Sequence, residues 1–317
     1  MRYLSFTIIA CFFFLVLSAQ DIKTFELRNR TGMKAVVSNY GARIMRLEVR
    51  NWNGRLEPVI KGYKHMSNYR DDTKLGATLM SFGGDVSSVL ADKVWETVKT
   101  DCQTVTFRCV TDIKDGGHDG KLNVSVTYTL SDQNALDIDY SMVSTIPTYY
   151  NLTNGIVNLS GDLTRSILKQ HLWIDSYKTN ILDTNHQLTN EQQNVRNTPL
   201  DFNQPRELGE RIEYLQNGYN HIFQLRHHSN EQSPDAILFD EQSGRVMTVY
   251  TIEPILHINS YGKQSTGISF QPIHGEYDDS KKEIKAMLSP GEVYRSATVF
   301  TFTTDPPLIM RKEHIGK

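Results

Sequence analysis

The stretch Lys121–Val143, which reads KLNVSVTYTLSDQNALDIDYSMV, decides the fold class. In its first half apolar residues alternate with polar ones, and the alternation resumes after the turn residues SDQN. A period of two places successive side chains on opposite faces of a strand, so each half predicts a strand with one buried face. The side chains expected to face the core are Leu122, Val124, Val126, Tyr128 and Leu130, then Leu136, Ile138, Tyr140 and Met142. Two such runs joined by a short turn predict an antiparallel hairpin.

Strands of the same kind recur on both sides of this hairpin. They read TFELRN, MKAVVSN, RIMRLEVRN, VWETVKT, TVTFRCV, RVMTVYT and SATVFTFTT, with clusters of Gly, Asn and Asp between them. Short helices are expected only at TNEQQNV (189–195) and ELGERIEYLQ (207–216). No Pro- or Ser-rich linker divides the chain. The sequence therefore predicts an all-β protein that forms one large antiparallel β-sandwich.

The first 19 residues have the composition of a secretory signal peptide. Arg2 precedes an apolar run that ends at Leu17, and Ser18 and Ala19 are small residues suited to cleavage. The alternative, a signal anchor, is disfavoured because a spanning helix needs about 20 apolar residues. We predict a signal peptide over residues 1–19 and one domain over residues 20–317. The mature protein is expected to be secreted, extracellular and not held in a membrane.

The charge, cysteine and histidine content of the chain argues against nucleic acid as a partner and against a metal site. The net charge is −2 and no basic block occurs, which argues against nucleic acid as a partner. In an extended chain Cys102 and Cys109 would lie roughly 23 Å apart, so a disulfide between them would need a bend. Two buried free thiols are the preferred interpretation, and the bridge stays open as an alternative. The pair His227–His228 has no third ligand nearby in sequence, so we predict no metal site.

Four Asn-x-Ser/Thr triplets offer acceptors for N-linked glycans in a secreted chain. They begin at Asn29, Asn123, Asn151 and Asn158. Each can be modified only where it is exposed, and Asn151 and Asn158 flank an expected strand. We expect these last two to be unmodified.

Between about Phe25 and Phe302 a series of segments resembles, in order, the galactose mutarotase (aldose 1-epimerase) family. The segments are MKAVVSNYGARIMRLEVRNWNGRLEPVIKGY, NYRDDTKLGAT, VSVTYTLSDQNALDIDYSM, NLTNGIVNLSGD, NTPLDFNQPRELGERI, GYNHIFQL, TIEPILHINSYGK, GISFQPI and LSPGEVYRSATVFTF. The resemblance implies a galactose mutarotase-like supersandwich. It also implies interconversion of hexose anomers without a cofactor. In this family a glutamate acts as base and a histidine as acid, while a second histidine, an arginine and an aspartate hold sugar hydroxyls.

The sequence departs from the family at the residues that move protons. Gly155 stands where the resemblance places the acid histidine, and Ser269 stands in place of the base glutamate. The sugar-binding aspartate reads Asn220, whereas Gln271 is kept. The family segment that carries the arginine is deleted between Thr78 and Trp95, and Phe82 falls at the second histidine's position. Neither glycine nor an unactivated serine can serve in acid–base catalysis near neutral pH.

Other polar residues lie close in sequence to these positions. A relocated acid/base pair drawn from His257, His274 and Glu276 is one interpretation, but coincidental placement of two such groups within ~3 Å of the proton is improbable. We prefer to treat these three as ordinary strand and loop residues. Asn220 and His221 are candidates to hold a hydroxylated ligand, with a purely structural role for His221 equally open.

We therefore predict a secreted mutarotase-fold protein that binds carbohydrate or a glycan-bearing partner and lacks epimerase chemistry. The predicted ligand-binding residues are Asn220, His221, Gln271 and His257, with no catalytic residue and no cofactor. One alternative is an active aldose 1-epimerase. A second is a secreted protein-interaction module without sugar affinity.

Overall fold

The computed structural model describes residues 21–311 except positions 73, 83–84, 88, 116–117, 147, 150–154, 183–187, 227–232, 275, 279–282 and 286. The predicted signal peptide (residues 1–19), Asn151 and His227–His228 lie outside the described residues. Side chains of some strand residues next to these gaps, among them Phe82 and Glu276, are also outside the description.

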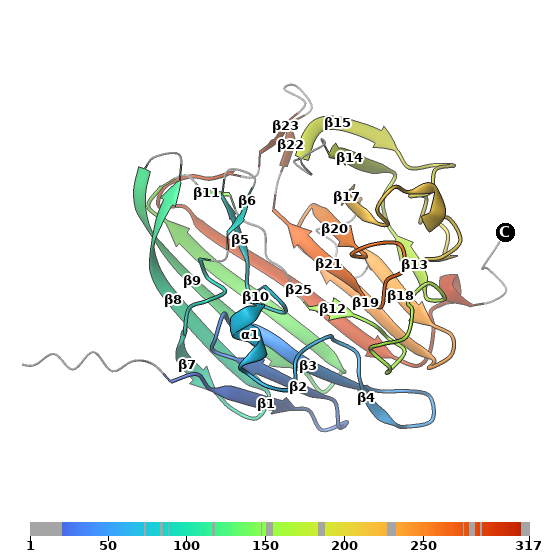
Figure 1. Ribbon diagram of the computed structural model, residues 1–317, viewed down its shortest axis with the longest axis horizontal. Helices are drawn as coiled ribbons and strands as arrows, with labels where there is room; N and C mark the ends of the chain where they lie inside the picture. The colour runs from blue at the N-terminus through green and yellow to red at the C-terminus, as the bar shows by residue number, and fades with distance from the viewer. Residues whose placement is uncertain are drawn as a thin grey trace, which may run out of the picture.

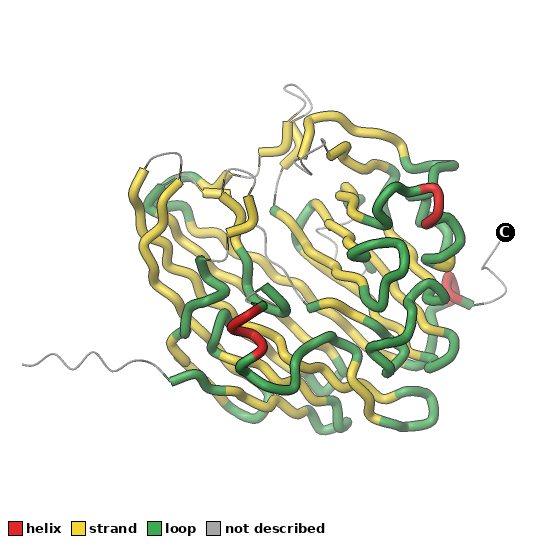
Figure 2. The backbone as a smooth tube through the Cα atoms, viewed as in Figure 1, coloured by secondary structure: helices red, strands yellow, loops and turns green. Residues whose placement is uncertain are grey.

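Two large antiparallel sheets form most of the molecule (Figure 1). The nine-stranded sheet runs β16 (Arg206–Glu207), β13 (His171–Ile174), β18 (Ala236–Asp240), β19 (Arg245–Thr251), β25 (Val293–Thr303), β10 (Ala135–Ser144), β9 (His118–Leu130), β8 (Thr104–Asp115) and β7 (Glu96–Thr100). The six-stranded sheet runs β12 (Ile156–Val157), β21 (Ile268–Ile273), β20 (Ile255–Asn259), β17 (Asn220–Gln224), β14 (Lys178–Leu182) and β15 (Leu188–Asn194). Strands dominate the tube in Figure 2, and the all-β prediction is confirmed.

Smaller elements complete the described chain. A four-stranded sheet runs β1 (Thr24–Arg28), β2 (Lys34–Ser38), β3 (Arg43–Arg50) and β4 (Leu56–Pro58). Three strand pairs join β5 (Met80–Phe82) to β6 (Asp85–Ser87), β11 (Thr148–Tyr149) to β24 (Met287–Leu288), and β22 (Glu276–Asp278) to β23 (Glu283–Lys285). The helices are α1 (Asn68–Asp71) and the 3-10 turns η1 (Ile212–Tyr214) and η2 (Leu308–Met310). No helix among the described residues combines the length and apolar character needed to cross a bilayer.

The hairpin that opened the sequence analysis forms as predicted. β9 and β10 pair antiparallel, with Leu130 opposite Leu136 and Val124 opposite Met142. All nine apolar side chains expected to face the core are buried. Their alternation with polar residues matches the pleat, because one face of the pair is packed and the other is not.

The predicted helix at TNEQQNV is wrong. Most of this stretch belongs to the edge strand β15, where Gln192 lies opposite Asn180. Its polar side chains obscure the period-two pattern, and pairing with β14 decides its conformation. Within ELGERIEYLQ the only helix is the single 3-10 turn η1.

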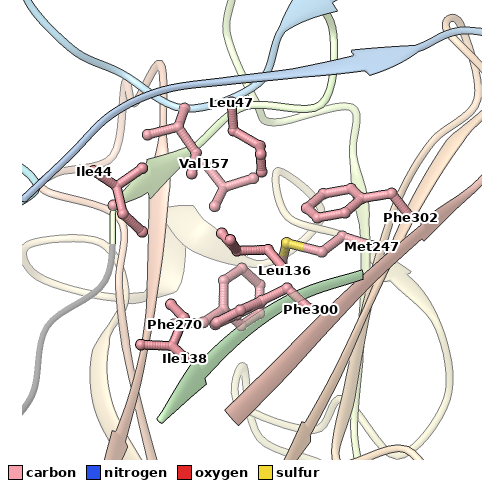
Figure 3. A pocket seen from close by; sticks show the side chains of 11 residues that line it. Ile44, Leu47, Leu136, Ile138, Val157, Met247, Phe270, Phe300 and Phe302 are labelled. Atoms are coloured by element: carbon pink, nitrogen blue, oxygen red, sulfur yellow. The ribbon is translucent and has the colours of Figure 1, made fainter. Parts of the chain in front are cut away.

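One apolar core joins the sheets. Figure 3 shows its centre, where side chains of β3, β10, β12, β19, β21 and β25 converge around a void of about 10 Å³. The lining is apolar and includes Ile44, Leu136, Phe270 and Phe300. A void that size is close to the minimum for one water molecule and offers it no polar partner. This void is therefore unsuited to bind a polar ligand.

The two cysteines in the described part of the chain, Cys102 and Cys109, are free thiols. Cys109 is buried in β8, where burial raises the pKa of its thiol to about 11. Cys102 is exposed, which corrects the expectation that both are buried. Asn123 is exposed, whereas Asn29 and Asn158 are buried at 7% and 0% exposure. Of the three described glycan acceptors, Asn123 alone is accessible.

Candidate functional site

The predicted ligand-binding residues gather on three neighbouring strands of the six-stranded sheet. His257 on β20 lies opposite Gln271 on β21, and Asn220 on β17 lies opposite Asn259. Asn259 in turn lies opposite Ser269. Residues directly opposite one another share a face of the sheet. We call this polar face, made by Asn220, His257, Asn259, Ser269 and Gln271, the amide face.

The other face of the same strands is part of the core. Phe223, Ile258 and Phe270 alternate with the polar residues and are almost completely buried. Successive side chains of a strand point to opposite faces of the sheet. Burial of these apolar residues on one face therefore places the short polar side chains together on the other. His221 lies on the same face as these apolar residues, opposite Ile258. Its Nδ1 accepts a hydrogen bond from the backbone N–H of Asn220 at 3.0 Å.

A chain of hydrogen bonds runs across the amide face. Gln271 Nε2 donates to Ser269 Oγ at 3.1 Å. Gln271 Oε1 lies 3.0 Å from His257 Nδ1, and Asn220 Oδ1 lies 2.7 Å from His257 Nε2. These two contacts join residues that are 14 and 37 positions apart in the sequence. The structure thus brings together Asn220, His257 and Gln271, three of the four predicted binding residues.

His257 is neutral at physiological pH. Burial, only partly offset by the hydrogen bond with Gln271, lowers the pKa of its imidazole to about 4. A neutral imidazole donates from one ring nitrogen and accepts at the other. The ring nitrogen that carries the proton therefore donates to the side-chain oxygen of Gln271 or of Asn220. The pKa of His221 is likewise lowered to about 4, by burial and then by the proximity of His257.

Ser269 has no activating partner in the described part of the chain. Its hydroxyl is fully buried and meets the side chains of Gln271 and Tyr261 and the carbonyl of Asn259. The Tyr261 hydroxyl donates to Ser269 Oγ at 3.2 Å. Neither an imidazole nor a carboxylate reaches this oxygen among those contacts, so the serine is unsuited to act as a base.

Tyr261 is a site residue that the sequence analysis missed. It follows β20 with a positive φ of 56°, and 55% of its surface is exposed. Burial of its hydroxyl end raises the pKa of the phenol. In the sequence, the SYGK turn directly after a strand was the only sign of this residue. In the structure, its positive φ marks a constrained site, because left-handed backbone is uncommon away from glycine.

On the β12 side, the residue opposite Ser269 is aliphatic. Ile156 on β12 lies opposite Ser269 on β21. Gly155, which precedes it, is packed so closely that a Cβ atom there would lie 2.6 Å from Ile60 Cγ2. Gly155, which the resemblance places at the acid position, has no side chain that could transfer a proton, and the neighbouring Ile156 is aliphatic.

Further amides extend the polar face toward the sheet edge. Asn180 on β14 is 1% exposed, and Gln224 Nε2 donates to its Oδ1 at 3.4 Å. Among the described residues, Asn180 Nδ2 has no hydrogen-bond partner. A buried donor of this kind is normally satisfied by water or a ligand. Single asparagine and glutamine residues in short strands gave no sequence signal.

A carboxylate–imidazole contact does occur, but at the other end of β20. Glu253, 2% exposed, lies 3.3 Å from His274 Nδ1 and accepts a hydrogen bond from the Tyr294 hydroxyl. Glu253 is six residues before Asn259, the partner of Ser269, which corresponds to about 20 Å along a strand. His274 and His257 therefore do not form one proton-transfer centre around Ser269. The side chain of Glu276 lies outside the described residues.

The described residues contain no cluster of three or more His, Cys, Asp or Glu side chains placed to bind a metal ion. The donors of the amide face are uncharged amides, hydroxyls and a neutral imidazole. Such groups can bind and orient hydroxyl groups of a ligand.

Comparison with known proteins gives a consistent result. A family model described as aldose 1-epimerase matches residues 83–301. The chain is 26% identical to the galactose mutarotase of Sus scrofa, covering 90% of this chain and 95% of the relative. It is 22% identical to the aldose 1-epimerase of Escherichia coli (strain K12), covering 90% and 96%.

Solved structures share the fold. A GalM/aldose epimerase homologue from C. elegans superposes with a TM-score of 0.77 at 20% identity, covering 89% of this chain and 99% of the other. Galactose 1-epimerase from Lactobacillus acidophilus NCFM gives a TM-score of 0.69 at 20% identity, covering 90% and 96%.

Proposed function

This chain belongs to the aldose 1-epimerase family, and from that membership we propose that it binds carbohydrate without interconverting anomers. Family membership supplies the ligand class as a starting hypothesis, since fold alone does not fix function. The local geometry supports each half of the proposal separately.

The single observation that carries the loss of catalysis is the pairing of Ser269 with Ile156. Opening and reclosing a hexose ring needs one group to remove the proton of the anomeric hydroxyl and another to protonate the ring oxygen. A buried, unactivated serine faces a hydrocarbon side chain at these positions. His257 is the nearest described imidazole, and with a pKa lowered to about 4 it is not a proton donor at neutral pH.

The binding half of the proposal rests on the amide face. Asn220, His257 and Gln271 are held in fixed orientations by mutual hydrogen bonds. A preorganised set of uncharged donors and acceptors suits a neutral, hydroxyl-rich ligand, because little entropy is lost in ordering the site. The partly exposed ring of Tyr261 adds an apolar surface for one face of a sugar ring.

The test compares turnover with binding in the same preparation. Polarimetry on freshly dissolved α-glucose and α-galactose is expected to show the rate of buffer alone, whereas calorimetric titration with these hexoses is expected to show binding. Asn220→Ala should weaken that binding, while Arg108→Ala, at an exposed position of β8 in the other sheet, should not. Turnover above background that disappears in His257→Ala would establish an active epimerase. Absence of both turnover and hexose binding would favour the protein-interaction role.

We also propose that the chain is exported and carries a glycan on Asn123. The apolar run of residues 1–19 supports export, and the exposure of Asn123 supports modification at that residue. Expression in a secreting eukaryotic cell should place the protein in the medium with an N-terminus near residue 20. Removal of N-glycans should lower its apparent mass, and Asn123→Gln should lose most of that shift while Asn158→Gln should not. Retention in the cytosol would contradict the proposal.

A further inference from the structure

A polar cleft separate from the amide face lies at the end of β3. It has a volume of about 310 Å³ and is lined by the end of β3, the β3–β4 loop, Asn134 and the end of β25. Its floor is apolar and includes Met33 and Phe302, both buried. Its walls include Arg50, Trp52 and Thr303. The volume is at the lower end of the range of about 300–1,000 Å³ that is usual for small-molecule sites.

Trp52 is held in place although most of it faces solvent. Its backbone N–H donates to the carbonyl of Ser243 at 3.0 Å. Its ring lies against Gly244, where an added Cβ would come within 2.8 Å of Trp52 Cε3. Even so, 60% of the residue is exposed. A large aromatic surface left in water beside polar groups is a feature of binding sites.

The loop that carries Trp52 is ordered by its own hydrogen bonds. Asn51 Oδ1 accepts from the backbone N–H groups of Asn53 at 3.0 Å and Arg55 at 2.9 Å. The N–H of Gly54 donates to the carbonyl of Asn51 at 2.8 Å. A ligand that contacts Trp52 would therefore meet a preformed surface and lose little affinity to loop ordering.

Arg50 places a positive charge in the same cleft. Its Nε donates to the carbonyl of Thr31 at 3.2 Å and its Nη1 to the carbonyl of Gly54 at 2.8 Å. Among the described residues, none of the ion pairs involves Arg50, although other exposed arginines such as Arg28 and Arg46 are paired. The guanidinium is thus oriented by carbonyls and keeps a net charge for an anionic partner.

We propose that this cleft binds an acidic saccharide, with the apolar face of a pyranose ring on the Trp52 indole and a carboxylate or sulfate ester on Arg50. The aromatic ring supplies the surface that a sugar face needs, and the guanidinium supplies the planar donors that carboxylate and sulfate accept from. This site is independent of the amide face and of the function proposed for it. It assigns a role to an exposed tryptophan and an unneutralised arginine that the family resemblance leaves unexplained.

Calorimetric titration with four probes tests the proposal: methyl β-D-glucuronide, glucose 6-sulfate, methyl β-D-glucoside and inorganic sulfate. We expect the two acidic sugars to bind at least about tenfold more tightly than the neutral glucoside, as a charge-assisted hydrogen bond would require. Comparing glucuronide with sulfate ester identifies the preferred acid. Iodide quenching provides a second readout, because Trp95 is 1% exposed and Trp52 is the most exposed of the three tryptophans. Bound acidic sugar should protect the quenchable fraction.

Matched variants locate the binding. In an Asn220→Ala background, which weakens sugar binding at the amide face, Arg50→Gln should reduce acidic sugars to the affinity of the glucoside, and Trp52→Ala should abolish the binding that remains. Trp52→Phe keeps a ring on Gly244 and should retain measurable binding, which guards against misfolding of the alanine variant. Arg295→Gln and Tyr214→Ala, which change an exposed arginine and an exposed aromatic residue outside the cleft, should leave affinity unchanged.

Several results would overturn the proposal. They are equal binding of neutral and acidic sugars, protection by inorganic sulfate as strong as by the sugars, or no binding of any probe. Loss of binding in Asn220→Ala with Trp52→Ala unaffected would place the ligand on the amide face instead.

Discussion

At the scale of single residues, the side chains of the amide face are uncharged near pH 7. Ser269 is a buried hydroxyl, His257 is an uncharged imidazole, and Asn220 and Gln271 are amides. Each can accept or donate a hydrogen bond, but none changes its protonation near pH 7. These side chains are the reason we propose binding without proton transfer.

Restoring one catalytic group should therefore fail. Ser269→Glu would put a carboxylate at a fully buried position opposite Ile156. We expect no mutarotation above the buffer rate, because this change adds a base but no acid that could protonate the ring oxygen of a hexose. We also expect a loss of about 2 kcal/mol or more in the free energy of unfolding, measured in urea, because the charge would be poorly solvated. Turnover in this single variant would contradict the inactive assignment.

The two buried histidines should make stability depend on pH. Their folded-state pKa values of about 4 lie below the ordinary 6.5, so the unfolded chain binds more protons between these pH values. The free energy of unfolding should be full above pH 6.5 and fall as the pH drops toward 4. Each histidine should contribute about 1–3 kcal/mol to that loss.

Urea titrations between pH 4 and 7.5 measure this effect. His257→Gln should flatten the dependence, whereas exposed His65→Gln should not. An equally steep profile in His257→Gln would show that other groups govern acid sensitivity.

At the scale of elements, the short strand β12 decides what faces Ser269. Its two residues pair with β21 on one side, and Val157 bridges to Ile60 on the other. Ile60 fills the space beside Gly155, so the glycine is required by packing rather than by backbone conformation. The packing of this element therefore disfavours any side chain at position 155, where the resemblance places the acid.

That coupling can be measured with a double-mutant cycle. Gly155→Ala should destabilise the protein by about 1–3 kcal/mol, since its Cβ would approach Ile60 Cγ2 to 2.6 Å. Ile60→Ala will be destabilising alone, but the Gly155→Ala/Ile60→Ala pair should cost less than the sum of the single changes. Additive free energies from urea unfolding would show that the contact is not the constraint.

At the scale of the whole molecule, Arg245 ties three parts of the chain together. It is fully buried at the start of β19. Its Nε donates to the carbonyl of Val49, its Nη1 to the carbonyl of Leu159, and its Nη2 to Glu57 Oε2 at 2.6 Å. These acceptors belong to β3, to the chain after β12 and to β4, so one side chain links the four-stranded sheet to both large sheets.

Arg245→Met should lower the free energy of unfolding by about 3 kcal/mol or more, because it leaves buried acceptors without a donor. Lys169→Met, at an exposed lysine paired with Glu207 at 2.7 Å, should cost about 1 kcal/mol or less. Thermal and urea unfolding of the two variants provide the comparison. Similar stability of both would mean that the linkage through Arg245 contributes little.

The sequence by itself determined the strands of the central hairpin, the all-β class and the presence of a hydroxyl rather than a carboxylate at position 269. Alternation and residue identity are local properties, and a side chain that is absent cannot be supplied by folding. Where alternation was lost, as in β15, the local signal gave the wrong element.

Only the tertiary structure decided that Ile156 faces Ser269, that His257 lies between two amides, and that Arg50, Trp52 and Phe302 share one cleft. Each of these depends on register and burial between segments far apart in the chain. The physical reason is that strand pairing sets which residues meet, and burial then sets their pKa values and exposure. Neither quantity is contained in the pattern of any one strand.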